Sequence, residues 1–136
     1  MKKYLYMIAA LFGIDYCCKE NIEAQKPEDF PRDMEKSHGK IRLYRNHNDG
    51  FCFGVKKEKK ELVRMVPVVF TSAAAGILTW LLCRDEGRKA DRIGFALITA
   101  GGLSNLYDRL KRGYVVDYFS IRCKYLEKVV FNLGDF

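Results

Sequence analysis

Apolar residues are concentrated in three stretches of the chain, and densely charged segments separate them. The clearest stretch, residues 65–83, contains no charged side chain over 19 positions. That length is close to the ~20 residues with which a helix crosses a bilayer. Pro67 falls in the first turns of this helix, where a missing backbone N–H does least harm. The pattern predicts helices over about 4–19, 62–83 and 90–107.

Shorter alternating segments predict a small β-rich portion. Residues 41–44 (I-R-L-Y) alternate apolar and polar positions like a strand. Asn48-Asp49-Gly50 is a turn signal, because these residue types tolerate positive φ, and residues 51–53 are compatible with a resumed strand. Residues 115–116 and 129–131 are predicted to be short strands that flank a loop. We therefore expect an outer loop over about 20–61 and an outer β segment over about 113–135.

The amino terminus is similar to a signal peptide, with two lysines before a short apolar core. Cys17 follows Ile14-Asp15-Tyr16, whereas processing sites need small residues there, so we predict an uncleaved first helix. Asp15 and Lys19 are four residues apart and share one face of this helix. They could form a local ion pair worth about 0.3–0.5 kcal/mol, or they could order the helix end beside a functional site.

Composition limits the remaining possibilities. The 136 residues suit a single domain, 1–136. The net charge of +7 could indicate nucleic acid or anionic lipid. Membrane lipid is preferred to nucleic acid, because no recognition helix or aromatic stacking platform accompanies the charge. The five cysteines are odd in number and lack C-x-x-C spacing, so neither a disulfide framework nor a zinc site follows. We expect no metal and no cofactor.

The distribution of lysine and arginine predicts an orientation in the membrane. The positive-inside rule places the basic amino terminus and the 84–92 loop in the cytoplasm. Residues 17–64 and 113–136 would then lie on the outer side, although the 17–64 loop is itself rich in mixed charge. The expected location is therefore a cell membrane, with several spans and the functional site near the outer face.

Two aspartates are the candidates for catalysis. Asp117 and Asp135 each follow an apolar stretch, and ionisable groups at a membrane boundary are functional candidates. Two carboxylates that share a site cannot both ionise comfortably, so one retains a proton near neutral pH. The ionised partner can activate a water while the protonated one donates to a carbonyl oxygen. The alternative on chemistry alone is a pair of capping or interfacial carboxylates.

The motifs around these aspartates resemble those of one family. Residues 101–118, G-G-L-S-N-L-Y-D-R-L-K-R-G-Y-V-V-D-Y, closely resemble the signature G-G-x-x-G-N-x-x-D-R-x-x-x-G-x-V-V-D-F of lipoprotein signal peptidases, or signal peptidase II. F-N-L-G-D at 131–135 is similar to the family's F-N-x-A-D. D-Y-C-C-K at 15–19 resembles D-Q-x-x-K, and N-D-G-F-C-F-G at 48–54 resembles N-x-G-A-A-F-G. The four motifs occur in order over almost the whole chain.

The resemblance implies roles for individual residues. Asp117 and Asp135 would be the catalytic dyad of an aspartic endopeptidase. Asn105, Asp108, Arg109 and Asn132 would orient the dyad and the backbone around it. Asn48 would line the substrate groove, and Asp15 and Lys19 would support the site from the first helix. For two residues a structural role stays open: Asn105 could bond a helix terminus, and Arg109 could pair with Asp108 or lipid phosphate.

This chain departs from the family pattern at several positions. Ser104 replaces the glycine before Asn105, and Phe51 and Cys52 replace two small residues of the outer-loop motif. A fourth membrane helix of the family normally begins around the second aspartate, whereas this sequence stops at Phe136. We therefore expect a truncated fourth helix and weak activity, restored by an appended apolar segment of ~20 residues.

The resulting prediction is a mainly α-helical polytopic membrane protein of three transmembrane helices, a truncated fourth, and a small extracytoplasmic β-rich portion. Its expected function is removal of the signal peptide from bacterial prolipoproteins before a diacylglyceryl-modified cysteine, by a monomer. One alternative is a non-catalytic or truncated family member that binds lipidated signal peptides. A second alternative is a basic membrane-surface or nucleic-acid-binding protein.

Overall fold

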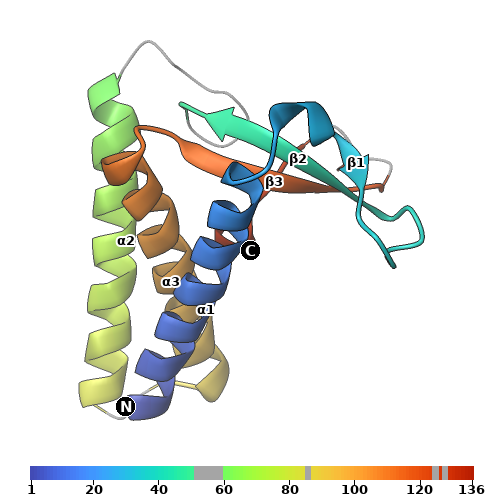
Figure 1. Cartoon of the computed structure of the whole chain (residues 1–136). Helices are drawn as coiled ribbons and strands as arrows, with labels where there is room; N and C mark the ends of the chain where they lie inside the picture. Colours follow the sequence, from blue (N-terminus) through green and yellow to red (C-terminus); the bar gives the residue numbers. More distant parts are fainter. Residues whose placement is uncertain (51–59, 85–86, 124–125, 127–128) are drawn as a thin grey trace.

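Three helices pack side by side and carry a small sheet at one end (Figure 1). The computed structural model describes residues 1–50, 60–84, 87–123, 126 and 129–136, with backbone only for 60–64. The helices are α1 (Lys2–Glu23), α2 (Lys60–Cys83) and α3 (Lys89–Lys111). Helix α3 packs against both other helices. Helices α1 and α3 end four residues beyond their predicted ends, as polar turns toward the sheet, whereas α2 ends at Cys83 as predicted and begins two residues earlier.

The sheet has three antiparallel strands in the order β1-β2-β3. They are β1 (Arg32–Asp33), β2 (Ile41–Asn48) and β3 (Val115–Ile121). Strands β2 and β3 pair over most of their length, with Asn46 opposite Asp117 and an irregularity in register between Leu43 and Asn46. Sequence patterning found the start of β2 and of β3 but neither strand's full length. The short β1 and the 3-10 turn η1 (Pro27–Asp29) were not predicted.

The predicted strand at 129–131 is wrong for Val129 and Val130. Only Phe131 makes a bridge, antiparallel to Phe119, and the chain then enters the 3-10 turn η3 (Leu133–Asp135). This turn lies where the family pattern suggested the start of a fourth helix. It packs against α3 and α1, so the chain folds back into the angle between helices and sheet (Figure 1). The predicted strand at 51–53 lies outside the described residues.

Buried apolar residues form two small clusters. One joins the three helices at the end that carries the amino terminus, through Tyr4, Leu78 and Ala96. The other joins the end of α1 to β3, through Ile22, Val116 and Tyr118. The second cluster fixes the sheet on the helices, and Asp117 lies between its two β3 members. Among the described helices, α2 is long and apolar enough over 65–83 to cross a membrane.

Candidate active site

Asn132 brings the two candidate aspartates to one place. Its side-chain amide donates to Asp117 Oδ1 at 2.8 Å, and its backbone N–H donates to Asp135 Oδ2 at 3.0 Å. Asp117 is supplied by β3 and Asp135 by η3, and the bridge between Phe119 and Phe131 aligns these segments. The structure therefore juxtaposes two carboxylates that are 18 positions apart in the chain.

Each aspartate receives a second amide from another element. Asn48, the last residue of β2, donates from Nδ2 to Asp117 Oδ2 at 3.2 Å. Asn105 of α3 donates from Nδ2 to Asp135 Oδ1 at 3.0 Å. The side chain of Asn105 is thus directed at the second aspartate rather than at a helix terminus, which was its alternative role. Three asparagines predicted from the motifs hold the pair.

The two carboxyl groups differ in exposure. Asp117 is buried, with 4% of its surface exposed, and desolvation together with the negative charge of Asp135 raises its pKa to about 6. Asp135 is exposed as a residue, but desolvation of its carboxylate by the surrounding protein also raises its pKa, against the opposing effect of hydrogen bonds from Asn132 and Asn105. Both carboxyl groups are therefore desolvated, although Asp135 as a residue has more exposed surface than Asp117.

A buried cluster of charges lies directly behind the dyad. Lys19 has no exposed surface, and its ammonium lies 2.8 Å from Asp15 Oδ2 and 3.0 Å from Asp108 Oδ2. It also donates to Asn105 Oδ1 at 2.9 Å. Asp15 and Lys19 form the predicted i, i+4 ion pair, but the pair is fully buried. Lys19 also connects the pair to the side-chain amide of Asn105, which binds Asp135. The second role considered for these two residues fits this geometry.

Asp108 and Arg109 bind backbone atoms on either side of the site. Asp108 Oδ2 accepts from the N–H of Val116, the residue before Asp117, at 3.2 Å. Arg109 donates to the carbonyl of Gly50 at 3.1 Å and to that of Asn105 at 3.3 Å. The guanidinium of Arg112 approaches Asp108, with its Nε 3.6 Å from Asp108 Oδ1.

Glycines allow close packing around α3, including that of η3, the turn that carries Asp135. A Cβ on Gly101 would stand 2.1 Å from the carbonyl oxygen of Gly134, and a Cβ on Gly102 would stand 2.3 Å from Thr71 Oγ1 of α2. Gly102 therefore allows close packing of α3 on α2, whereas Gly101 allows close packing of α3 on η3. Because the clash at Gly101 is with backbone, only glycine fits there without moving η3.

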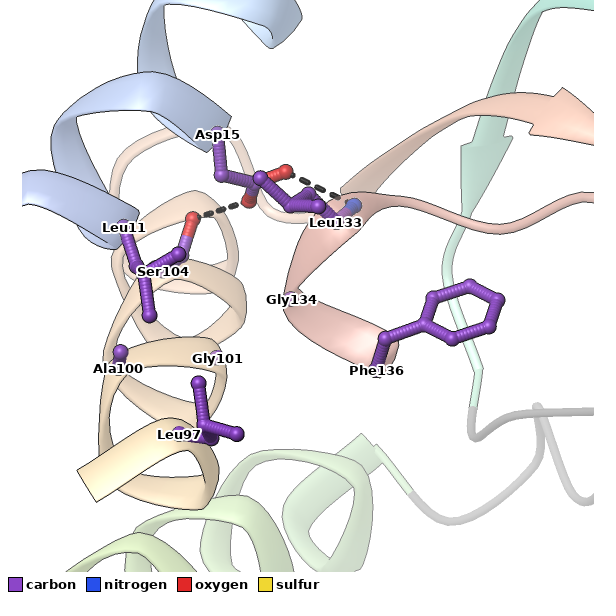
Figure 2. Close-up of a pocket in the computed structure, with 9 residues that line it drawn as sticks. All are labelled: Leu11, Asp15, Leu97, Ala100, Gly101, Ser104, Leu133, Gly134 and Phe136. Atoms are coloured by element: carbon purple, nitrogen blue, oxygen red, sulfur yellow. Dashed lines mark hydrogen bonds between the residues drawn. The ribbon is translucent and has the colours of Figure 1, made fainter. Parts of the chain in front are cut away.

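A cavity of about 200 Å³ opens between α1, α3 and η3, and Figure 2 shows its lining. Leu11, Leu97 and Ala100 form apolar walls, while Asp15 and Ser104 contribute polar atoms near Leu133. Ser104 was predicted only as a departure from the family pattern, and no role was predicted for Tyr118. In the structure both hydroxyls bind Asp15. No local pattern indicated this, because α1, α3 and β3 meet only in the folded chain.

Within the described part of the chain, no group of three or more His, Cys, Asp or Glu is arranged to hold a metal ion. The described cysteines, at 17, 18, 83 and 123, are free thiols.

Comparison with known proteins supports the fold and shows the family. A structure described as a bacterial membrane enzyme has the same fold, with a TM-score of 0.79 and 19% identity over 99% of this chain and 79% of that one. The family model for signal peptidase (SPase) II matches residues 7–136. The chain therefore belongs to the signal peptidase II family.

Individual relatives carry the same description. The lipoprotein signal peptidase of Aquifex aeolicus is 29% identical over 135 residues, which cover 97% of this chain and 76% of the relative. The lipoprotein signal peptidase of Brucella ovis is 33% identical over 95 residues, which cover 70% of this chain and 58% of the relative. The match thus spans less than two thirds of the Brucella enzyme's length.

Proposed function

We propose that this chain is an aspartic endopeptidase of the membrane that removes signal peptides from prolipoproteins, cutting before a diacylglyceryl-modified cysteine. Family membership supports the substrate class. The observation that carries the aspartic mechanism is the binding of Asp117 and Asp135 to one residue, Asn132, through its side chain and its backbone. Two carboxyl groups held in this way are what general acid–base hydrolysis without a separate nucleophile requires.

The pair shares one proton near neutral pH. The raised pKa of Asp117, about 6, favours this aspartate as the proton carrier, while amide donors from Asn105 and Asn132 favour the charged form of Asp135. The ionised carboxylate takes a proton from a water, whose oxygen attacks the scissile carbonyl carbon. The protonated carboxyl group gives its proton to the carbonyl oxygen. Collapse of the resulting diol breaks the C–N bond: the leaving nitrogen receives the proton that the first carboxylate took from water, and the second carboxylate regains a proton from a diol hydroxyl.

Exposed apolar side chains favour insertion of all three helices in a membrane. Large apolar residues face outward on α1 (Leu5, Ile14), on α2 (Val69, Phe70, Trp80) and on α3 (Ile98, Leu110). In water these surfaces would be costly, and in lipid they are favourable. The proposed location is a bacterial plasma membrane with three spans, and the dyad lies near the outer face, at the sheet end of the helices (Figure 1).

The direct test replaces each aspartate with asparagine, which retains shape but cannot exchange a proton. Asp117→Asn and Asp135→Asn should each slow cleavage of a lipidated precursor in detergent by at least ~10³-fold. Asp91→Asn is the matched control, because Asp91 pairs with Arg88 at the start of α3, outside the site. Near wild-type cleavage by either dyad variant would exclude the assignment. A wild-type protein that binds the precursor without cutting it would instead favour a non-catalytic family member.

A further inference from the structure

The carboxylate of Asp15 is held by four donors from four elements. Its Oδ2 accepts from Ser104 Oγ at 2.5 Å and from Lys19 at 2.8 Å. Its Oδ1 accepts from the hydroxyl of Tyr118 at 2.9 Å and from the backbone N–H of Leu133 at 3.0 Å. Asp15 is 1% exposed, so all of these bonds are formed away from solvent. Such fully satisfied buried networks are rigid and specify one geometry.

Two of these donors connect Asp15 to the dyad. Leu133 begins the turn that carries Asp135, so the bond to its N–H fixes where that turn starts. Lys19 also holds Asn105 Oδ1, and the same amide donates to Asp135. Asp15 therefore controls the position of Asp135 by two routes, through the backbone of η3 and through the side chain of Asn105.

The other two donors are the hydroxyls of Ser104 and Tyr118. Both residues are buried, since Ser104 is 3% exposed and Tyr118 is 8% exposed. They come from α3 and β3, and each binds a different oxygen of the same carboxylate (the Ser104 contact is drawn in Figure 2). Without them, Asp15 would have two of its four donors left.

We propose that Ser104 and Tyr118 are positioning residues that orient Asp15 and thereby set the catalytic geometry of Asp135. The inference rests on the proposed function. Each hydroxyl restrains one oxygen, so either one limits rotation of the carboxylate, and when both are absent only Lys19 and the Leu133 N–H hold it. A displacement of ~1 Å at a reacting group can cost ~10²-fold in rate, whereas substrate contacts would be unchanged. The effect should therefore appear in kcat and not in KM.

The activity test compares Ser104→Gly, Tyr118→Phe and the double variant in precursor cleavage. We expect each single change to lower kcat about 3-fold, and the double change to lower it by ~10²-fold, which exceeds the roughly 10-fold product of the singles. KM should stay within about twofold of wild type. Thr99→Val and Tyr114→Phe are matched controls, because each removes a hydroxyl bonded elsewhere, to Phe95 and to Glu23. They should leave kcat unchanged.

Two further variants, Ser104→Thr and Ser104→Val, separate the loss of the hydroxyl from the change in side-chain size. Threonine and valine have nearly equal volume, and only threonine retains the hydroxyl. Ser104 borders the cavity between α1, α3 and η3, so either side chain has room. The threonine variant should retain most of the wild-type kcat, and the valine variant should show the loss. Equal kcat in these two variants would overturn the proposal, as would a loss in the two hydroxyl controls that matches the loss in the site variants.

Hydrogen exchange of the Leu133 amide tests the same inference without catalysis. This N–H binds Asp15 and also lies 3.2 Å from the Tyr118 hydroxyl. In the double variant its exchange should accelerate ~10-fold or more, while amides inside α2 should be unaffected. Unchanged exchange at Leu133 would refute the positioning role. Failure of wild type to cleave any lipidated precursor would refute the proposed function instead, and the exchange result would still stand.

Discussion

Replacing Lys19 with methionine removes the one positive charge at the centre of the buried cluster while retaining a side chain of similar length. In the native chain its ammonium lies 2.8 Å from Asp15 and 3.0 Å from Asp108, and both carboxylates are 1% exposed. After the change, Asp15 loses the ammonium that it contacts in the described part of the chain, whereas Asp108 keeps Arg112 at 3.6 Å. Removing one partner of a buried ion pair costs about 3–5 kcal/mol, because a charge remains desolvated and uncompensated.

For a chain of this length, ~1 kcal/mol at the midpoint changes Tm by about 3–5 °C. Lys19→Met should therefore lower Tm by ~10 °C or more in detergent at pH 7. Lys40→Met, at an exposed position, is the control and should change Tm by no more than ~2 °C. Adding Asp108→Asn to Lys19→Met should recover part of the loss, because it removes one of the two buried negative charges that Lys19 contacts. A Lys19→Met protein that melts within ~3 °C of wild type would refute this account of the cluster.

Three further predictions concern the dyad and the membrane orientation. Asp117 has a folded-state pKa of about 6, above its ordinary value of 3.8, so its contribution to stability is present below pH ~4 and is lost as pH rises through ~6. Asp117→Asn cannot ionise at this position, so its free energy of unfolding should exceed that of wild type by up to about 3 kcal/mol at pH 8 and should nearly equal it at pH 4. Thermal unfolding that gives the same difference between the two proteins at both pH values would contradict this. Asn48 lowers the pKa of Asp117 by hydrogen bonding, so Asn48→Ala should move the limb of the kcat/KM profile due to Asp117 to higher pH, and a move to lower pH would be inconsistent. Cys83 and Cys123 are both exposed, so in single-cysteine variants an impermeant thiol reagent added to intact cells should label Cys123 much faster than Cys83; the reverse order would invert the proposed topology.

The helices and the two candidate aspartates were predicted from different features of the sequence. The helices follow from local apolar patterning, so α1, α2 and α3 could be placed to within a few residues. Asp117 and Asp135 were found because compact motifs surround them, and the structure brings them together through Asn132. Their catalytic role remains a proposal, and so do the roles of the seven supporting residues.

Other features required contacts between distant segments. The strand predicted at 129–131 failed because Val129 and Val130 have strand-forming side chains but no partner strand, and only Phe131 pairs, with Phe119. The two-residue β1 has no pattern of its own and exists because β2 pairs with it. Ser104 and Tyr118 could not be connected to Asp15, since their sequence separations from it are 89 and 103 residues.

The adjacent glycines of α3 have a consequence for how this active site can be altered. Neighbouring residues on a helix point about 100° apart, and Gly101 contacts the turn that carries Asp135 while Gly102 contacts α2. The rotation of α3 about its own axis is therefore limited from two directions. Turning the helix to make room for a side chain at one position drives the other position into its neighbour. Efforts to widen the cavity between α1, α3 and η3 should accordingly leave Gly101 and Gly102 unchanged and vary its α1 wall, at Leu11.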